Sequence, residues 1–127
     1  MSSPETRQRP LSPHLQVYRP QLTSITSILH RITGAALVAG TAMVVWWLEA
    51  AAIGEIAYEG ARSFAASPLG TFMLFGWSVA LYYHLFNGIR HLIWDSVHLF
   101  ELKNAYIAGY VVLALTVLAT AITWGMA

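Results

Sequence analysis

The sequence of 127 residues predicts an all-α membrane protein, with an N-terminal arm at 1–23 and a domain of three transmembrane helices at 24–127. The first observation is the composition: 57% of the residues are hydrophobic, 10% are charged, and the mean hydropathy is +0.55. Soluble domains carry about 25% charged residues, so this chain lacks the polar side chains that would cover a globule in water. The second observation is the presence of three stretches without Asp, Glu, Lys or Arg: 32–48, 63–89 and 104–127.

These stretches predict membrane-spanning helices, because a span needs about 20 apolar residues. The helices are expected at about 24–49, 67–95 and 104–126. The second begins at Ser67 and Pro68, and a proline suits the first turn of a helix, where its missing N–H is not needed. The connection at 50–66 is expected to form a short helix at the membrane interface.

Residues 1–23 are expected to form a polar arm on the cytoplasmic side of the membrane. Four prolines in this segment favour an extended chain, and no apolar run follows its basic residues as it would in a signal peptide. Either the arm lies against a soluble partner through four apolar side chains, or it is a disordered tail. The four side chains are Leu11, Leu15, Val17 and Tyr18.

The placement of basic residues predicts the orientation. Lys and Arg are concentrated in the N-terminal flank and in the connection between the second and third helices, to which we assign Arg90 and Lys103. The first connection has only Arg62, beside three glutamates. Because basic flanks stay on the inner side, the N-terminus is expected to be cytoplasmic. Without a transit-like N-terminus, a bacterial inner membrane is favoured over a mitochondrial one.

Several classes of site are excluded by what the chain lacks. With no cysteine, it cannot form a disulfide scaffold, or a thiolate zinc or iron–sulfur site, on its own. A net charge of +1 does not indicate the basic surface that binding to nucleic acid needs. No nucleophile–base pair, phosphate loop or carboxylate dyad occurs, so a self-contained hydrolase or transferase is unsupported.

The first helix carries three polar residues near its inner end, and ionisable residues at membrane depth are usually functional. Ser27 and Arg31 are four residues apart and share a face, which His30 flanks. A hydroxyl and a guanidinium together can hold a carbonyl oxygen or an anion. Alternatively, Arg31 extends to the lipid phosphates and Ser27 bonds only to its own helix backbone.

The second helix carries a polar stripe formed by His84, Gly88, His91 and Asp95, which are spaced four, three and four residues apart. His84 lies about 16 Å along the axis from Asp95, well inside the hydrocarbon, whereas His30 and His91 lie nearer the boundary. An imidazole at this depth is either a haem ligand or a hydrogen-bonded packing residue. A six-coordinate haem would need its second ligand from another subunit.

Two multi-residue patterns resemble the succinate dehydrogenase cytochrome b subunit family. The first is Arg9-Pro10-Leu11 followed by Ser27-Ile-Leu-His30-Arg31-Ile-Thr33. The second is His84-Leu-Phe-Asn-Gly88-Ile-Arg90-His91-Leu-Ile-Trp94-Asp95. The resemblance covers essentially the whole chain in family order. It implies a membrane anchor of complex II, bundled with a second small anchor subunit beside an iron–sulfur subunit and a flavoprotein.

The resemblance also implies a set of site residues. His84 would be one axial ligand of haem b, and the second anchor subunit would supply the other. Ser27 and Arg31 would line the ubiquinone pocket. His30, Arg31 and His91 would reach the haem propionates. The subunit alone would not be catalytic.

Three other interpretations remain open at this point. The chain could be a cofactor-free membrane scaffold or assembly protein, in which His84 only packs. It could be a proton- or ion-conducting bundle, although the outer halves of its helices lack ionisable residues. It could also anchor a fumarate reductase, which runs the same reaction in reverse.

Overall fold

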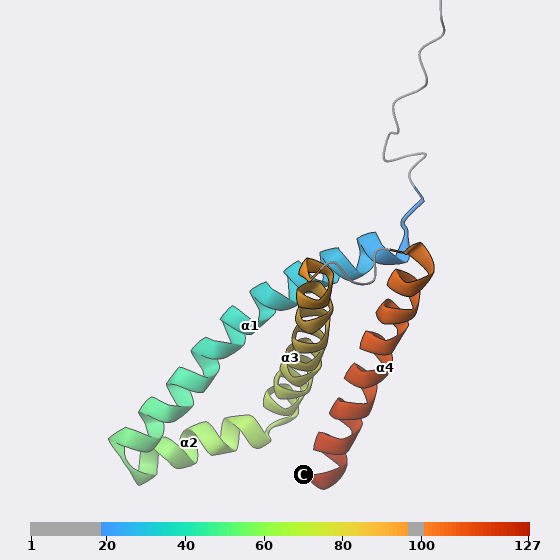
Figure 1. The fold of residues 1–127 in the computed structure, drawn as a ribbon. Helices are drawn as coiled ribbons and strands as arrows, with labels where there is room; N and C mark the ends of the chain where they lie inside the picture. Colours follow the sequence, from blue (N-terminus) through green and yellow to red (C-terminus); the bar gives the residue numbers. More distant parts are fainter. Residues whose placement is uncertain (1–18, 97–100) are drawn as a thin grey trace, which may run out of the picture.

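A computed structural model describes residues 19–96 and 101–127, and these parts of the chain are helical with short connections. The helices are α1 (Leu22–Ile53), α2 (Glu55–Ala66), α3 (Pro68–Asp95) and α4 (Leu102–Met126) (Figure 1). Three segments are long and apolar enough to cross a membrane, namely Leu22–Ile53, Pro68–Asp95 and Lys103–Met126. The predicted fold class and its three spans are therefore confirmed. The contacts predicted for the arm at Leu11, Leu15, Val17 and Tyr18 lie outside the described residues.

Helix α1 is longer than predicted at both ends. It contains 32 residues and is therefore about 48 Å long, more than the hydrocarbon core of about 30 Å. The alanines after Glu49 continue the helix, which stops only at Gly54. There the backbone adopts φ 139°, a value that residues with a side chain rarely adopt. The N–H of Gly54 donates a hydrogen bond to Ala50 O at 3.3 Å and so ends the helix. The 12-residue helix α2 follows directly and forms the short helix expected in the 50–66 connection.

The start of α3 follows the sequence prediction. Pro68 occupies the first turn, and the Ser67 side chain accepts a hydrogen bond from Gly70 N at 3.1 Å. Helix α3 lies between α1 and α4 and packs against both (Figure 1). The neighbours run antiparallel, so the start of α1, the end of α3 and the start of α4 meet at one end of the molecule.

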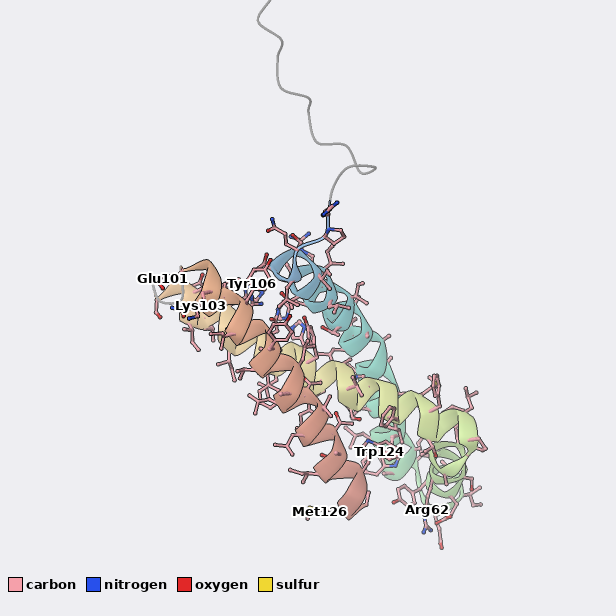
Figure 2. The ribbon with its side chains drawn as sticks, turned by 90° about the vertical axis from the view of Figure 1, so that its right-hand side faces the viewer. Arg62, Glu101, Lys103, Tyr106, Trp124 and Met126 are labelled. Carbon is pink, nitrogen blue, oxygen red and sulfur yellow. The ribbon has the colours of Figure 1, made fainter. Side chains whose placement is uncertain are left out.

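This end is called the histidine end below, and the opposite end, where α2 connects α1 to α3, is called the α2 end. Figure 2 shows Glu101 and Lys103 at the histidine end, with Arg62 and Trp124 toward the α2 end. Few side chains are fully buried, and those at the helix contacts are small or polar. Most large apolar side chains face outward, as expected for surfaces that meet lipid or another chain.

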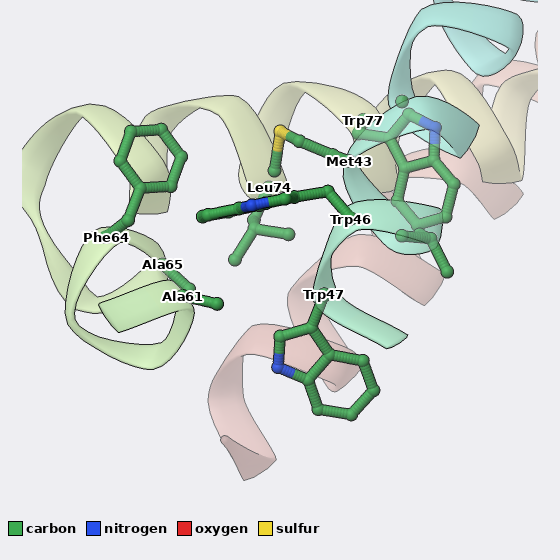
Figure 3. Close-up of a pocket in the computed structure, with 10 residues that line it drawn as sticks. Met43, Trp46, Trp47, Ala61, Phe64, Ala65, Leu74 and Trp77 are labelled. Carbon is green, nitrogen blue, oxygen red and sulfur yellow. The ribbon is translucent and has the colours of Figure 1, made fainter. Parts of the chain in front are cut away.

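An apolar cavity of about 290 Å³ lies at the α2 end, between α1, α2 and α3 (Figure 3). Met43, Trp46, Phe64 and Leu74 are among its lining residues. The Trp46 and Phe64 rings meet edge to face, with their centroids 5.6 Å apart. Side-chain shape therefore dominates the packing at this end.

Candidate functional site

Three imidazoles come together at the histidine end, one from α1 and two from α3. The rings of His30 and His84 are stacked, with centroids 3.9 Å apart and planes 8° from parallel. The ring of His91 lies 5.0 Å from that of His30, tilted by 54°. The stripe on α3 thus faces α1 through His84 and His91. The stacking of His30 on His84 depends on how the helices cross, which the spacing within one helix does not indicate.

The hydrogen bonds of His84 indicate where its proton lies. Its Nδ1 atom is 3.0 Å from the backbone oxygen of His30 and 3.3 Å from Thr33 Oγ1. A carbonyl oxygen only accepts, so Nδ1 carries the hydrogen and Nε2 retains a lone pair. Nε2 has no hydrogen-bond partner among residues 19–96 and 101–127. An Nδ1–H bonded to a backbone carbonyl is the arrangement that typically supports a metal-ligating histidine.

A glycine on α1 makes room for this imidazole. A Cβ atom added at Gly34 would lie 3.1 Å from His84 Cε1, tighter than most contacts in proteins. A Cβ at Gly88 would lie 3.7 Å from His30 Cε1, an ordinary contact. The packing beside the stacked rings therefore tolerates a Cβ at Gly88, whereas Gly34 allows the close approach of α1 to His84. Sequence reasoning singled out Gly88 and missed Gly34, whose signal is its position one turn after His30.

The assignment of Arg90 to a basic flank between helices is wrong. Its side chain is only 2% exposed and lies inside the bundle, because α4 begins directly beside this part of α3. One terminal nitrogen, Nη1, donates to Thr26 Oγ1 at 3.0 Å and to Asn87 Oδ1 at 3.1 Å. The other, Nη2, donates to Ala105 O at 3.3 Å. The guanidinium also lies 4.0 Å from the centroid of the Trp94 ring. Through its hydrogen bonds, Arg90 joins α1, α3 and α4.

Two neighbours on α3 complete this network around Thr26. Tyr83 donates its hydroxyl to the backbone oxygen of Thr26 at 2.8 Å. Asn87, which is fully buried, donates to the same oxygen at a longer 3.5 Å and also contacts His91 Nε2 at 3.3 Å. The peptide group between Thr26 and Ser27 is therefore held directly by α3. We define Thr26, Tyr83, Asn87 and Arg90 as the arginine network.

Ser27 and Arg31 lie on α1 beside the histidine cluster. Ser27 is half-buried, and its hydroxyl has no hydrogen-bond partner among the described residues, whereas Thr26 and Thr33 bond to their own helix backbone. Arg31 is exposed. Neither side chain forms a hydrogen bond to the three imidazoles within the described part of the chain. Both polar groups are thus left available to a molecule bound from outside.

The donors at the histidine end fit a haem iron better than a metal ion held by protein ligands alone. Residues 19–96 and 101–127 contain no group of three or more His, Cys, Asp or Glu placed to share one metal ion. A haem iron takes four ligands from its porphyrin and needs at most two axial ligands from protein. The Nε2 lone pair of His84 fits one axial position. The buried Nδ1 atom of His30 has no partner in the described structure, which is typical of a group that a ligand satisfies.

Comparison with known proteins places the chain in a family. Residues 5–123 match the family described as succinate dehydrogenase/fumarate reductase transmembrane subunit. The chain is 49% identical over 116 residues to the succinate dehydrogenase cytochrome b556 subunit of Paracoccus denitrificans, covering 87% of this chain and 89% of that protein. It is 39% identical over 117 residues to the subunit of the same name from Rickettsia prowazekii, covering 92% of this chain and 91% of the relative.

A mitochondrial relative shows the same similarity. The chain is 45% identical over 118 residues to the mitochondrial succinate dehydrogenase cytochrome B subunit of Schizosaccharomyces pombe, covering 88% of this chain and 65% of that protein. The resemblance found in the two sequence patterns is thereby confirmed. The chain belongs to the succinate dehydrogenase/fumarate reductase transmembrane subunit family.

Proposed function

We propose that this chain is a membrane-anchor subunit of succinate:ubiquinone oxidoreductase that ligates haem b through His84 and helps to form the ubiquinone-reduction site. One observation carries the haem assignment: Nδ1 of His84 lies 3.0 Å from the His30 carbonyl, which leaves Nε2 as a free lone pair. The relatives are named as cytochrome b subunits, which supports a haem partner. The alternative is a cofactor-free scaffold or assembly protein, in which the imidazoles only pack.

In this proposal, the chain's own residues hold and orient the haem. His84 would bind the haem iron through Nε2, and its bond to the His30 carbonyl would fix the direction of the ring. The candidates for contact with the propionates are His30, Arg31 and His91. His30 and His91 belong to the histidine cluster, and Arg31 follows His30 on α1. A bound haem supplies single-electron storage and transfer.

The quinone site in this proposal uses Ser27 and Arg31. The Ser27 hydroxyl, which is unpartnered among the described residues, donates to a quinone carbonyl oxygen. The exposed guanidinium of Arg31 stabilises the negative charge that develops on that oxygen during reduction. Because the arginine network holds the Thr26–Ser27 peptide, the hydroxyl is presented from a fixed backbone.

The remaining partners follow from the same proposal. The second small anchor subunit supplies the other axial ligand, and electrons arrive from succinate through a flavoprotein and an iron–sulfur subunit. The chain is a multi-pass protein of a bacterial inner membrane, consistent with its three apolar spans and its bacterial relatives. The basic N-terminal flank supports a cytoplasmic N-terminus.

The haem assignment is tested by the haem-to-flavin ratio of purified complexes. His84→Ala should abolish or greatly reduce bound haem, because its axial bond is lost. Trp77→Phe is the control, since it changes another ring on α3 two turns away. A His84→Ala complex with the haem content and spectrum of the native complex would support the scaffold alternative.

The quinone assignment is tested by comparing two electron acceptors. Arg31→Ala should slow ubiquinone reduction by about tenfold or more, while succinate oxidation with a soluble dye stays near normal. Arg62→Ala, which removes an exposed arginine at the α2 end, should change neither rate. An equal loss of both activities in Arg31→Ala would contradict a specific role at the quinone.

A further inference from the structure

The arginine network contains a chain of donors and acceptors in which each assignment forces the next. It begins at Arg90, whose guanidinium is donor-only under all ordinary conditions. Since Nη1 of Arg90 lies 3.1 Å from Asn87 Oδ1, that atom must be the amide oxygen. The other amide atom, Nδ2, lies 3.5 Å from the backbone oxygen of Thr26, which only accepts. Both partners favour the same orientation of the Asn87 amide, and the contact to Arg90 is the shorter and therefore the main determinant.

This orientation determines the protonation of His91. The Nδ2 group of Asn87 is a donor and lies 3.3 Å from His91 Nε2. Nε2 must therefore accept, and the single proton of the neutral ring lies on Nδ1. Nδ1 of His91 has no hydrogen-bond partner in the described parts of the chain. An N–H donor is thus left free on the ring that lies 5.0 Å from His30.

We propose that Arg90 and Asn87 are positioning residues that hold the proton of His91 on Nδ1, so that this N–H donates to a carboxylate bound beside the histidine cluster. The tautomer follows from the contacts of this chain alone. The carboxylate, which would be a haem propionate, rests on the proposed function.

A purely structural role would explain the arginine network less well. Arg90 has no carboxylate partner within the described residues, and burying an unpaired charge is costly. Helices can be packed together by apolar side chains of similar volume without that cost. A buried Arg90 does, however, impose one amide orientation, because it can only donate. An apolar side chain at the same place would not impose it.

The test uses Asn87→Asp in the purified complex reconstituted in lipid. The substitution is nearly isosteric and keeps an acceptor for Arg90, so the network retains its packing. Both carboxylate oxygens accept, however, and Nε2 of His91 must then donate. Solid-state NMR of ¹⁵N-histidine-labelled complex reports which ring nitrogen carries hydrogen, and the signals of His91 are identified by their loss in His91→Gln. Asn104→Asp on α4 is the matched control.

The native complex and Asn104→Asp should show His91 protonated on Nδ1, and Asn87→Asp should show the proton on Nε2. Protonation on Nε2 in the native complex, or the same site in native and Asn87→Asp, would overturn the proposal. If Asn87→Asp does not assemble, Arg90→Gln replaces it, because a glutamine amide can still form hydrogen bonds but can either donate or accept. Without the guanidinium the amide can rotate, so both tautomers are expected, and a single Nδ1–H tautomer would refute the role of Arg90.

This readout is independent of the haem and quinone assignments. If His84→Ala retains native haem, the proposed function fails while the tautomer result still decides the role of Asn87 and Arg90. The carboxylate is tested separately through the absorption spectrum of the bound haem. The spectrum should shift in His91→Gln and in Asn87→Asp but not in Asn104→Asp, and an unchanged spectrum in all three would overturn that part of the proposal.

Discussion

The two ends of this bundle use the same helices but are held together by different forces. At the histidine end, Arg90 and its partners connect α1, α3 and α4 through hydrogen bonds between buried polar groups. At the α2 end, apolar and aromatic side chains surround a cavity of about 290 Å³, and the polar contacts include an exposed ion pair between Arg62 and Glu59 (Figure 3). The packing at the histidine end is determined by the direction of hydrogen-bond donors and acceptors. The packing at the α2 end is determined by the shapes of apolar side chains.

This difference explains why the proposed site lies where it does. A ligand pocket needs groups held in fixed directions, and hydrogen bonds to Thr26 and His91 provide that next to the proposed site residues. Packing by shape tolerates small shifts without a defined orientation. Substitutions at the histidine end should therefore change cofactor binding, with or without a loss of stability, whereas those at the α2 end should leave cofactor binding unchanged.

The largest effect is expected for Arg90→Met. It leaves Thr26 Oγ1 and Asn87 Oδ1 without a donor and removes one of the donors to Ala105 O, and each buried acceptor left without a donor costs about 1–3 kcal/mol. The thermal midpoint of the purified complex should fall strongly, and haem content should fall with it. Arg62→Met removes only a surface pair, worth about 0–1 kcal/mol, and should leave both unchanged. A native midpoint in Arg90→Met would show that the two ends do not differ as described.

A smaller effect, confined to stability, is expected for Gly40→Ala. A Cβ at this position would overlap the Trp77 ring near the α2 end, and overpacking typically costs about 1–3 kcal/mol. The thermal midpoint should fall while the haem-to-flavin ratio stays native. Gly76→Ala is the control, because a Cβ there meets nothing within 4 Å and should be neutral or slightly stabilising. Loss of haem in Gly40→Ala at unchanged stability would argue against separating the two ends.

The smallest effect on stability is expected for Gly34→Ala at the histidine end. The new Cβ would lie 3.1 Å from His84 Cε1, so the imidazole must shift by a few tenths of an ångström. We expect a thermal midpoint close to that of the native complex but a shifted haem absorption spectrum. The same measurement on Gly76→Ala should show no shift. If Gly34→Ala has a native spectrum, the contact between α1 and His84 does not orient the ligand.

The spans were predictable because charge-free stretches directly reflect the cost of charge in hydrocarbon. The ends of α1 were not, since the alanines after Glu49 continue the helix until Gly54 breaks it. The stripe of His84 and His91 followed from helical spacing within α3. Whether those residues bind haem or quinone stays a prediction, as do the roles of Ser27, His30 and Arg31.

The arginine network was missed because it depends on contacts between helices. Arg90 looked like a flanking basic residue near a helix end, and its burial requires the start of α4 to lie beside it. A signal was nevertheless present. Tyr83, Asn87 and Arg90 are spaced four and three residues apart, which makes a second polar stripe beside the histidine stripe on α3. The histidine stripe contacts α1, whereas the second stripe contacts α1 through Tyr83 and Asn87 and α4 through Arg90.

The central claim, that Nε2 of His84 ligates haem, is tested most directly by chemical rescue. In a purified His84→Gly complex, the space of the lost ring can accept free imidazole. The account predicts that the absorption bands of six-coordinate haem are lost in His84→Gly and return when haem and imidazole are added together, but not when haem is added alone. Native bands in His84→Gly without imidazole would contradict it, because the ligand would then come from elsewhere.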